Sequence, residues 1–136
     1  MRIVLDTNVV ASAMFWGDKP FQLLSAAREQ RIELVCSIAM LKELSNTLSK
    51  DKFFVKVAAS EQSVDKLVDG YATLLTLVRP QPIARIAPDP DDDVVIATAL
   101  AAKASYIVTG DKPLLGIKSY EGIEFLTVHD ALLLLP

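Results

Sequence analysis

The sequence has few of the residues on which disulfide-rich domains and several enzyme classes depend. Cys36 is the only cysteine among 136 residues, which excludes a disulfide framework and a zinc site built from thiolates. The five glycines form no glycine-rich phosphate-binding loop. The single histidine, His129, stands near the C-terminus, where no Ser–His or Cys–His catalytic pair can be argued. A functional site built from carboxylate and other oxygen-bearing side chains therefore remains as the main possibility.

Long hydrophobic runs are also missing. The longest candidate, residues 94–102, has about half the length that a membrane-spanning helix needs. At the N-terminus, Arg2 is followed by three apolar residues and then by Asp6, which is not a secretory signal. We therefore expect a cytoplasmic protein that contains no membrane segment.

The composition is that of one folded domain, which we place at residues 1–136. Hydrophobic residues make up 51% and charged residues 23%, so the chain can bury a sizeable core. The net charge of −3 argues mildly against a nucleic-acid binder. Five of the 17 acidic residues could belong to one site, namely Asp6, Glu43, Asp92, Asp93 and Asp111. The rest of the chain then contains 12 acidic and 14 basic residues. A slightly positive body around an acidic site is compatible with a polyanionic substrate held over a metal.

Short apolar segments alternate with longer helical patterns. We predict strands at 3–5, 34–36, 106–109 and 123–126, and helices at about 20–30, 38–49, 60–78 and 93–104. This alternation is typical of an α/β domain with a mainly parallel sheet between helical layers. Ligands bind such sheets at the carboxyl ends of the strands. Asp6 and Asp111 each follow a predicted strand, so we expect them at one edge.

A run of acids precedes the most apolar predicted helix. Asp89, Asp91, Asp92 and Asp93 lie within five consecutive positions. The helix dipole explains one or two acids in a first turn, but three successive Asp repel one another, and a bound hard cation such as Mg²⁺ or Mn²⁺ would remove that repulsion. Glu43, by contrast, falls off the apolar stripe of its helix, so periodicity predicts an ordinary solvated residue.

Four segments resemble the motifs of PIN-domain nucleases. They are Leu5-Asp6-Thr7-Asn8-Val9; Glu43-Leu44 with Thr47-Leu48; Asp89 to Asp93 followed by Ile96-Ala97 and Ala99; and Tyr106 to Asp111 followed by Leu114-Leu115. The resemblance extends to the tail and is greatest to the VapC toxins of toxin–antitoxin systems. It implies a three-layer α/β/α sandwich, a Mg²⁺- or Mn²⁺-dependent endoribonuclease, a small antitoxin partner and a homodimer.

The resemblance also implies roles for individual residues. The catalytic acids would be Asp6, Glu43, Asp93 and Asp111. Asp93 is preferred as the third acid because Ile96-Ala97 follows it at the family spacing, and Asp92 is the reserve. Asp6 and Asp93 would hold the metal, and Asp111 would contribute directly or through water. Glu43 would orient or deprotonate the attacking water.

Neighbouring residues are expected to support this site. Asn8 and Thr109 would hydrogen-bond the carboxylates and fix their orientation. Lys50, Lys52 and Lys56 surround Phe53 and Phe54, a combination of charge and stacking surface that suits RNA. A solvated face with two core aromatics is an equally good interpretation of that segment. Asp6 and Asn8 are also ordinary helix-capping residues.

Alternatives from other classes fit less well. Lys112-Pro113 resembles an element of receiver-like phospho-accepting signalling domains, but Thr7 follows Asp6 where such domains need a second acid. No Asp follows the predicted strand 34–36 either. A phosphatase of the haloacid-dehalogenase type needs Asp at position 8, which is Asn8. A non-catalytic RNA- or protein-binding module on the same fold would be favoured by loss of one of the four acids, and none is missing.

Overall fold

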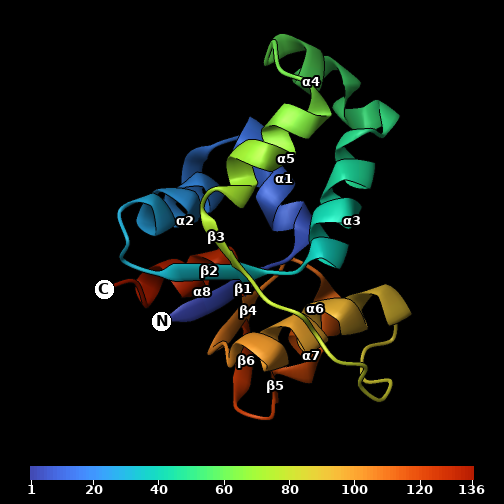
Figure 1. Cartoon of the computed structure of the whole chain (residues 1–136). Helices are drawn as coiled ribbons and strands as arrows, with labels where there is room; N and C mark the ends of the chain where they lie inside the picture. Colours follow the sequence, from blue (N-terminus) through green and yellow to red (C-terminus); the bar gives the residue numbers. More distant parts are fainter.

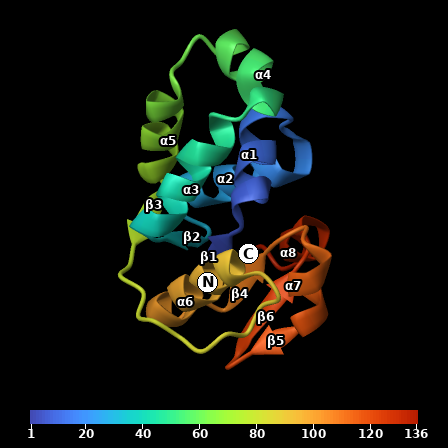
Figure 2. The same cartoon turned by 90° about the vertical axis from the view of Figure 1, so that its right-hand side faces the viewer.

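The computed structural model describes all 136 residues and shows a six-stranded sheet with helices on both faces (Figure 1, Figure 2). The strands are β1 (Arg2–Leu5), β2 (Glu33–Cys36), β3 (Leu75–Leu77), β4 (Tyr106–Val108), β5 (Ser119–Tyr120) and β6 (Ile123–Leu126). Their order in the sheet is β3-β2-β1-β4-β6-β5. Every neighbouring pair is parallel except β5 with β6. The predicted mainly parallel sheet is therefore confirmed.

The helices form the two outer layers. They are α1 (Thr7–Phe15), α2 (Asp18–Arg28), α3 (Ile38–Leu48), the 3₁₀ helix η1 (Asp51–Phe53), α4 (Phe54–Ala59), α5 (Val64–Ala72), α6 (Pro90–Ala102), α7 (Lys112–Ile117) and α8 (Val128–Leu133). In Figure 1, α1, α2, α3 and α5 lie on one side of the sheet, and α6 and α7 lie on the other. The three-layer sandwich is confirmed. None of the helices is long and apolar enough to cross a bilayer.

The central strands are buried on both faces. Along β1, Ile3 and Leu5 belong to one hydrophobic cluster and Val4 belongs to the other. In β4, Val108 and Ile107 divide in the same way. Successive residues of a strand point to opposite faces, so an unbroken apolar strand supplies two cores. This fixes the ends of β1 and β4 firmly in the middle of the sheet.

The predicted helix at 60–78 is too long at both ends, and its last residues are not helical. The helix begins after Ser63, whose hydroxyl accepts a hydrogen bond from the backbone N–H of Lys66, and it ends at Ala72. The residues that follow form the edge strand β3, which pairs with β2. Apolar residues 74–78 suit a helix or a strand, and pairing with the exposed edge of β2 decides between them. The sequence also left α1, α4, α7, α8 and β5 unassigned.

Candidate active site

Two acids lie side by side at the carboxyl edge of the sheet, and one threonine joins them. Leu5 is paired with Val108 in neighbouring strands, so Asp6 and Thr109 leave the sheet together. Oδ2 of Asp6 accepts a hydrogen bond of 2.7 Å from the hydroxyl of Thr109. The same hydroxyl oxygen accepts a bond of 3.0 Å from the backbone N–H of Asp111. Both Asp6 and Thr109 are buried. The positions of the two acids are thus fixed relative to each other.

Both acids also begin helices. At the start of α1, Oδ1 of Asp6 accepts a hydrogen bond of 2.8 Å from the backbone N–H of Thr7. Oδ2 of Asp111 accepts from the N–H of Leu114 at 3.1 Å at the start of α7. Helix N-termini carry a partial positive charge that stabilises carboxylates. Capping and membership of an acidic site are therefore compatible in this fold, and the helix ends help to hold negative charges close together.

Asp92, in the first turn of α6, faces these two acids. Its side chain is half-buried, and burial raises its pKa to about 6, assisted by the negative charges of Asp6, Asp111, Asp89 and Glu43. Like charges nearby disfavour ionisation of a carboxyl group. The influence of Asp6, Glu43 and Asp111 on one carboxyl shows that four separate parts of the chain meet here.

Glu43 completes this group from α3. The residue is half-buried, and burial raises its pKa, followed in importance by the charge of Asp6. The positive charge of Lys50 acts in the opposite direction. The solvated position that periodicity predicted for Glu43 is therefore wrong, because α3 packs against α1 and turns this polar face towards the site. We call Asp6, Glu43, Asp92 and Asp111 the acidic cluster.

Asp93, the expected third acid, makes different contacts from Asp92. Its Oδ1 accepts hydrogen bonds from the backbone N–H groups of Ile86 (3.1 Å) and Ala87 (2.8 Å). Its Oδ2 lies 3.3 Å from Nε of Arg85. Successive residues of an α-helix point about 100° apart, so Asp92 and Asp93 face different surroundings. Asp92 joins the acidic cluster, while Asp93 anchors the segment before α6.

The donors of the acidic cluster suit a hard cation, since all of them are oxygen. Thr7 Oγ1 lies beside Glu43, whose pKa it lowers, yet it is buried without a hydrogen-bond partner within reach. An orphaned buried hydroxyl next to crowded carboxylates leaves room for a further polar group. As they stand, no three acidic, histidine or cysteine side chains are close enough together to hold a metal ion. The sequence did not single out Thr7, although its place directly after Asp6 was the available signal.

Asn8, which was expected to hydrogen-bond the carboxylates, lies at the edge of the site. Its side chain is exposed and makes no hydrogen bond to the acids. It lines a hollow of about 370 Å³ together with Ser12, Thr109, Gly110 and His129. His129 is therefore near the site's edge, where it pairs with Asp130 at 3.2 Å.

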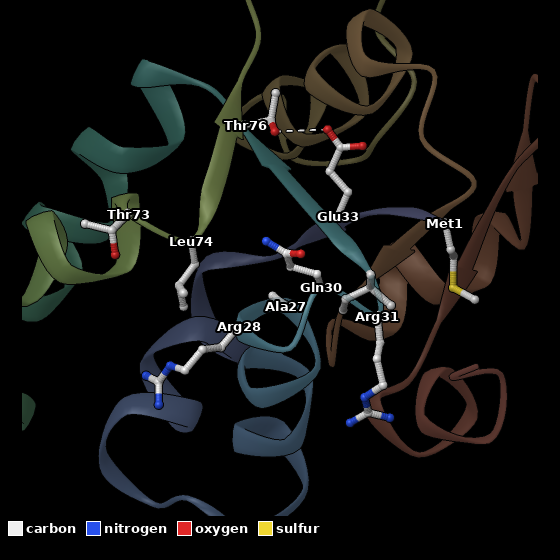
Figure 3. A pocket seen from close by; sticks show the side chains of 10 residues that line it. Met1, Ala27, Arg28, Gln30, Arg31, Glu33, Thr73, Leu74 and Thr76 are labelled. Carbon is white, nitrogen blue, oxygen red and sulfur yellow. Dashed lines mark hydrogen bonds between the residues drawn. The ribbon is translucent and has the colours of Figure 1, made fainter.

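A larger hollow, of about 520 Å³, lies at the opposite edge of the sheet (Figure 3). Glu33, at the start of β2, accepts hydrogen bonds there from Arg2 (2.9 Å) and Thr76 (3.0 Å). The carboxylate of Glu33 is therefore already paired, and the hollow is remote from the acidic cluster. Cys36 offers no alternative nucleophile, because burial raises the pKa of its thiol to about 11.

The basic segment after α3 contains one core aromatic and one exposed aromatic. Phe53 is 3% exposed, whereas Phe54 is 73% exposed. Lys50, Lys52 and Lys56 are all exposed. Of the two core aromatics in the second interpretation, only Phe53 packs in the core, where it cannot stack on a base. The role of the three lysines in RNA binding stays a prediction.

Comparisons with known proteins agree with this architecture. A chain in the crystal structure of VapBC2 from Rickettsia felis, bound to a DNA fragment from their promoter, matches 93% of this chain and 98% of its own length, with a TM-score of 0.63 and 16% identity. A chain in the structure of VapBC-1 from nontypeable Haemophilus influenzae matches 95% and 99%, with a TM-score of 0.56 and 16% identity. A search of curated proteins found no matching relative. The family model described as PIN domain matches residues 2–113, and the protein belongs to the PIN domain family.

Proposed function

We propose that this protein is a Mg²⁺- or Mn²⁺-dependent endoribonuclease that acts in the cytoplasm as the toxin of a toxin–antitoxin pair. The observation that carries the proposal is the acidic cluster, in which burial and mutual repulsion raise the pKa values of Asp92 and Glu43. Such crowding at one edge of a sheet is typical of a functional site. PIN domains are generally nucleases and typically use divalent metals, which supports the same conclusion.

The cation would be held by Asp6, Asp92 and Asp111. When bound, it would lower the pKa of a water molecule and stabilise negative charge on the phosphate. Thr109 donates to Asp6 and so fixes the direction of that carboxylate. Burial makes Glu43 a stronger base than an exposed glutamate. Glu43 therefore suits the acceptance of a proton from the attacking water at its carboxylate oxygen.

A small antitoxin and a homodimer are part of the same proposal. The support is that this chain shares its fold, over nearly its whole length, with chains of two VapBC structures. Co-expression with the product of the neighbouring reading frame tests the partner. We expect that product to co-purify with this chain and to suppress RNA cleavage.

The activity is tested on a mixed single-stranded RNA, with Mn²⁺ in one reaction and EDTA in the other. We expect cleavage only with Mn²⁺, and a loss by orders of magnitude in Asp6→Asn and Asp92→Asn. Asp89→Asn is the control, because Asp89 caps α6 on the exposed side and Asn caps equally well. Cleavage that survives Asp6→Asn or EDTA contradicts the proposal.

The same preparation tests the alternatives. Incorporation of label from a phosphodonor would favour a phospho-accepting domain. RNA binding with no cleavage under any metal condition would favour a non-catalytic module on the same fold.

A further inference from the structure

The only tryptophan of the chain lies on the surface at the end of α1. Trp16 is 57% exposed, although it is in contact with two other aromatic rings. The ring centres of Trp16 and Phe53 are 5.9 Å apart with the planes at 70°, and those of Trp16 and Phe15 are 6.2 Å apart at 86°. Phe53 is itself buried. The Trp16 ring is thus held by its edges against the core while much of its surface faces solvent.

Two lysine side chains lie over these rings. The ammonium group of Lys56 lies 5.3 Å from the centre of the Trp16 ring, and that of Lys52 lies 5.1 Å from the centre of the Phe53 ring. The segment also exposes Phe54 and Val55, which are 73% and 74% exposed. An aromatic surface under positive charges is the combination by which proteins hold single-stranded nucleic acid without reading its sequence.

One lysine of this segment extends its positive charge towards the acidic cluster. Lys50, at the end of α3, is near enough to Glu43 that its charge lowers the pKa of that carboxyl. Along α1, Trp16 follows Asp6 by ten positions, a distance of about 15 Å at the rise of an α-helix. In both overall views α4 lies beyond the end of α3 (Figure 1, Figure 2). A strand with a phosphate at the acidic cluster would reach Trp16 within a few nucleotides.

We infer that Trp16 is the stacking platform for an RNA base a few nucleotides from the scissile phosphate, with Lys50, Lys52 and Lys56 on the backbone of the same strand. This inference rests on the proposed function and adds the path of the substrate. A base that stacks on Trp16 takes the place of the Lys56 ammonium group, which then pairs with a phosphate. A polyanion is favoured over a protein partner because three exposed lysines lie in one short segment, with Lys56 over Trp16 and Lys50 near Glu43.

The experiment uses the emission of Trp16 in the full chain, with EDTA present so that the RNA stays intact. A single-stranded RNA of about eight nucleotides, within the usual size of such sites, should quench the emission in a saturable, salt-dependent way. The same RNA in a duplex, or a dinucleotide, should quench weakly. Unchanged emission at RNA concentrations that saturate the anisotropy of a labelled strand would overturn the inference, and would leave the exposed aromatic surface to a protein partner.

Variants separate stacking from folding. Trp16→Ala should weaken binding about 5- to 150-fold, the range expected for loss of one stacked base. Trp16→Phe keeps a ring against Phe15 and Phe53, so it should fold normally and bind at an intermediate level. Lys56→Gln should reduce the salt slope by about one ion. Lys103→Gln, at the exposed far end of α6, is the control and should change nothing. Equal binding by Trp16→Ala and the parent chain would contradict the inference.

The two proposals fail in different ways. Quenching by RNA without cleavage in Mn²⁺ would support the stacking role of Trp16 and contradict the nuclease activity. RNA cleavage that is unchanged in Trp16→Ala would support the nuclease activity and contradict the stacking role of Trp16.

Discussion

The hydroxyl of Thr109 lies 2.7 Å from Oδ2 of Asp6, although the two residues are 103 positions apart in the chain. Because the hydroxyl proton goes to Asp6, its oxygen is left to accept from the N–H of Asp111. One buried side chain therefore orients two members of the acidic cluster.

Thr109→Val should both destabilise the protein and reduce cleavage. Valine has a similar shape but leaves the buried Asp6 oxygen and the Asp111 N–H without this partner, at a cost of about 1–3 kcal/mol. Thr109→Ser keeps the hydroxyl and should retain most of the activity. Thermal unfolding and RNA cleavage measure the two effects, and a fully active Thr109→Val would show that the orientation of Asp6 is unimportant.

Asp92→Asn and Asp93→Asn should have opposite consequences. Asp92 faces like charges, so its neutralisation should remove cleavage without loss of stability. Asp93 accepts two backbone hydrogen bonds and pairs with Arg85. Its neutralisation should cost about 1 kcal/mol of unfolding free energy and leave the cleavage rate of the folded protein nearly unchanged. The reverse pattern would restore Asp93 as the third acid.

The stability of the metal-free protein should fall between pH 4 and 6 and then level off. The pKa of Asp92 is about 6 in the folded state against an ordinary value of 3.8, so the folded state binds more protons in this window. Asp92→Asn should therefore match the parent chain near pH 4 and exceed it above pH 6. We expect a gain of about 1 kcal/mol after allowance for screening by solvent. Urea unfolding at the two pH values in EDTA provides the measurement, and equal stability at high pH would contradict it.

Millimolar Mn²⁺ should raise the melting temperature of the parent chain by mass action. Near pH 6 binding should also release protons, because Asp92 is then partly protonated and a cation requires the carboxylate. Calorimetry in two buffers of different ionisation enthalpy counts the protons. Asp6→Asn should show neither effect, and a melting curve of the parent chain that ignores Mn²⁺ would count against the metal site.

The positions of Asp6 and Asp111 could be predicted from the sequence, because they depend on where the strands of the sheet end. Asp6 and Asp111 follow apolar strands, and the ends of neighbouring parallel strands must meet at one edge. The position of Glu43 depends instead on how α3 packs against α1, and periodicity within one helix does not contain that information. Only the family resemblance placed it in the site.

The choice between Asp92 and Asp93 could not be made from the sequence. Both lie in the first turn of α6, and one residue of difference changes the direction of a side chain by about 100°. The partners that distinguish Asp93 from Asp92, Ile86 and Ala87, lie in a segment without regular structure. Trp16 was also missed, since an isolated aromatic forms no pattern until Phe15, Phe53 and Lys56 surround it.

The hydrogen bonds of Asp93 provide a probe of the first turn of α6 that does not depend on activity. The amide hydrogens of Ile86 and Ala87 belong to no helix or strand, and both donate to the carboxylate of Asp93, so we expect that carboxylate to slow their exchange with solvent. Their exchange rates therefore report whether the first turn of α6 is intact. Two slowly exchanging amides in an otherwise irregular segment would reveal local opening beside Asp92 under conditions where no RNA and no metal are present.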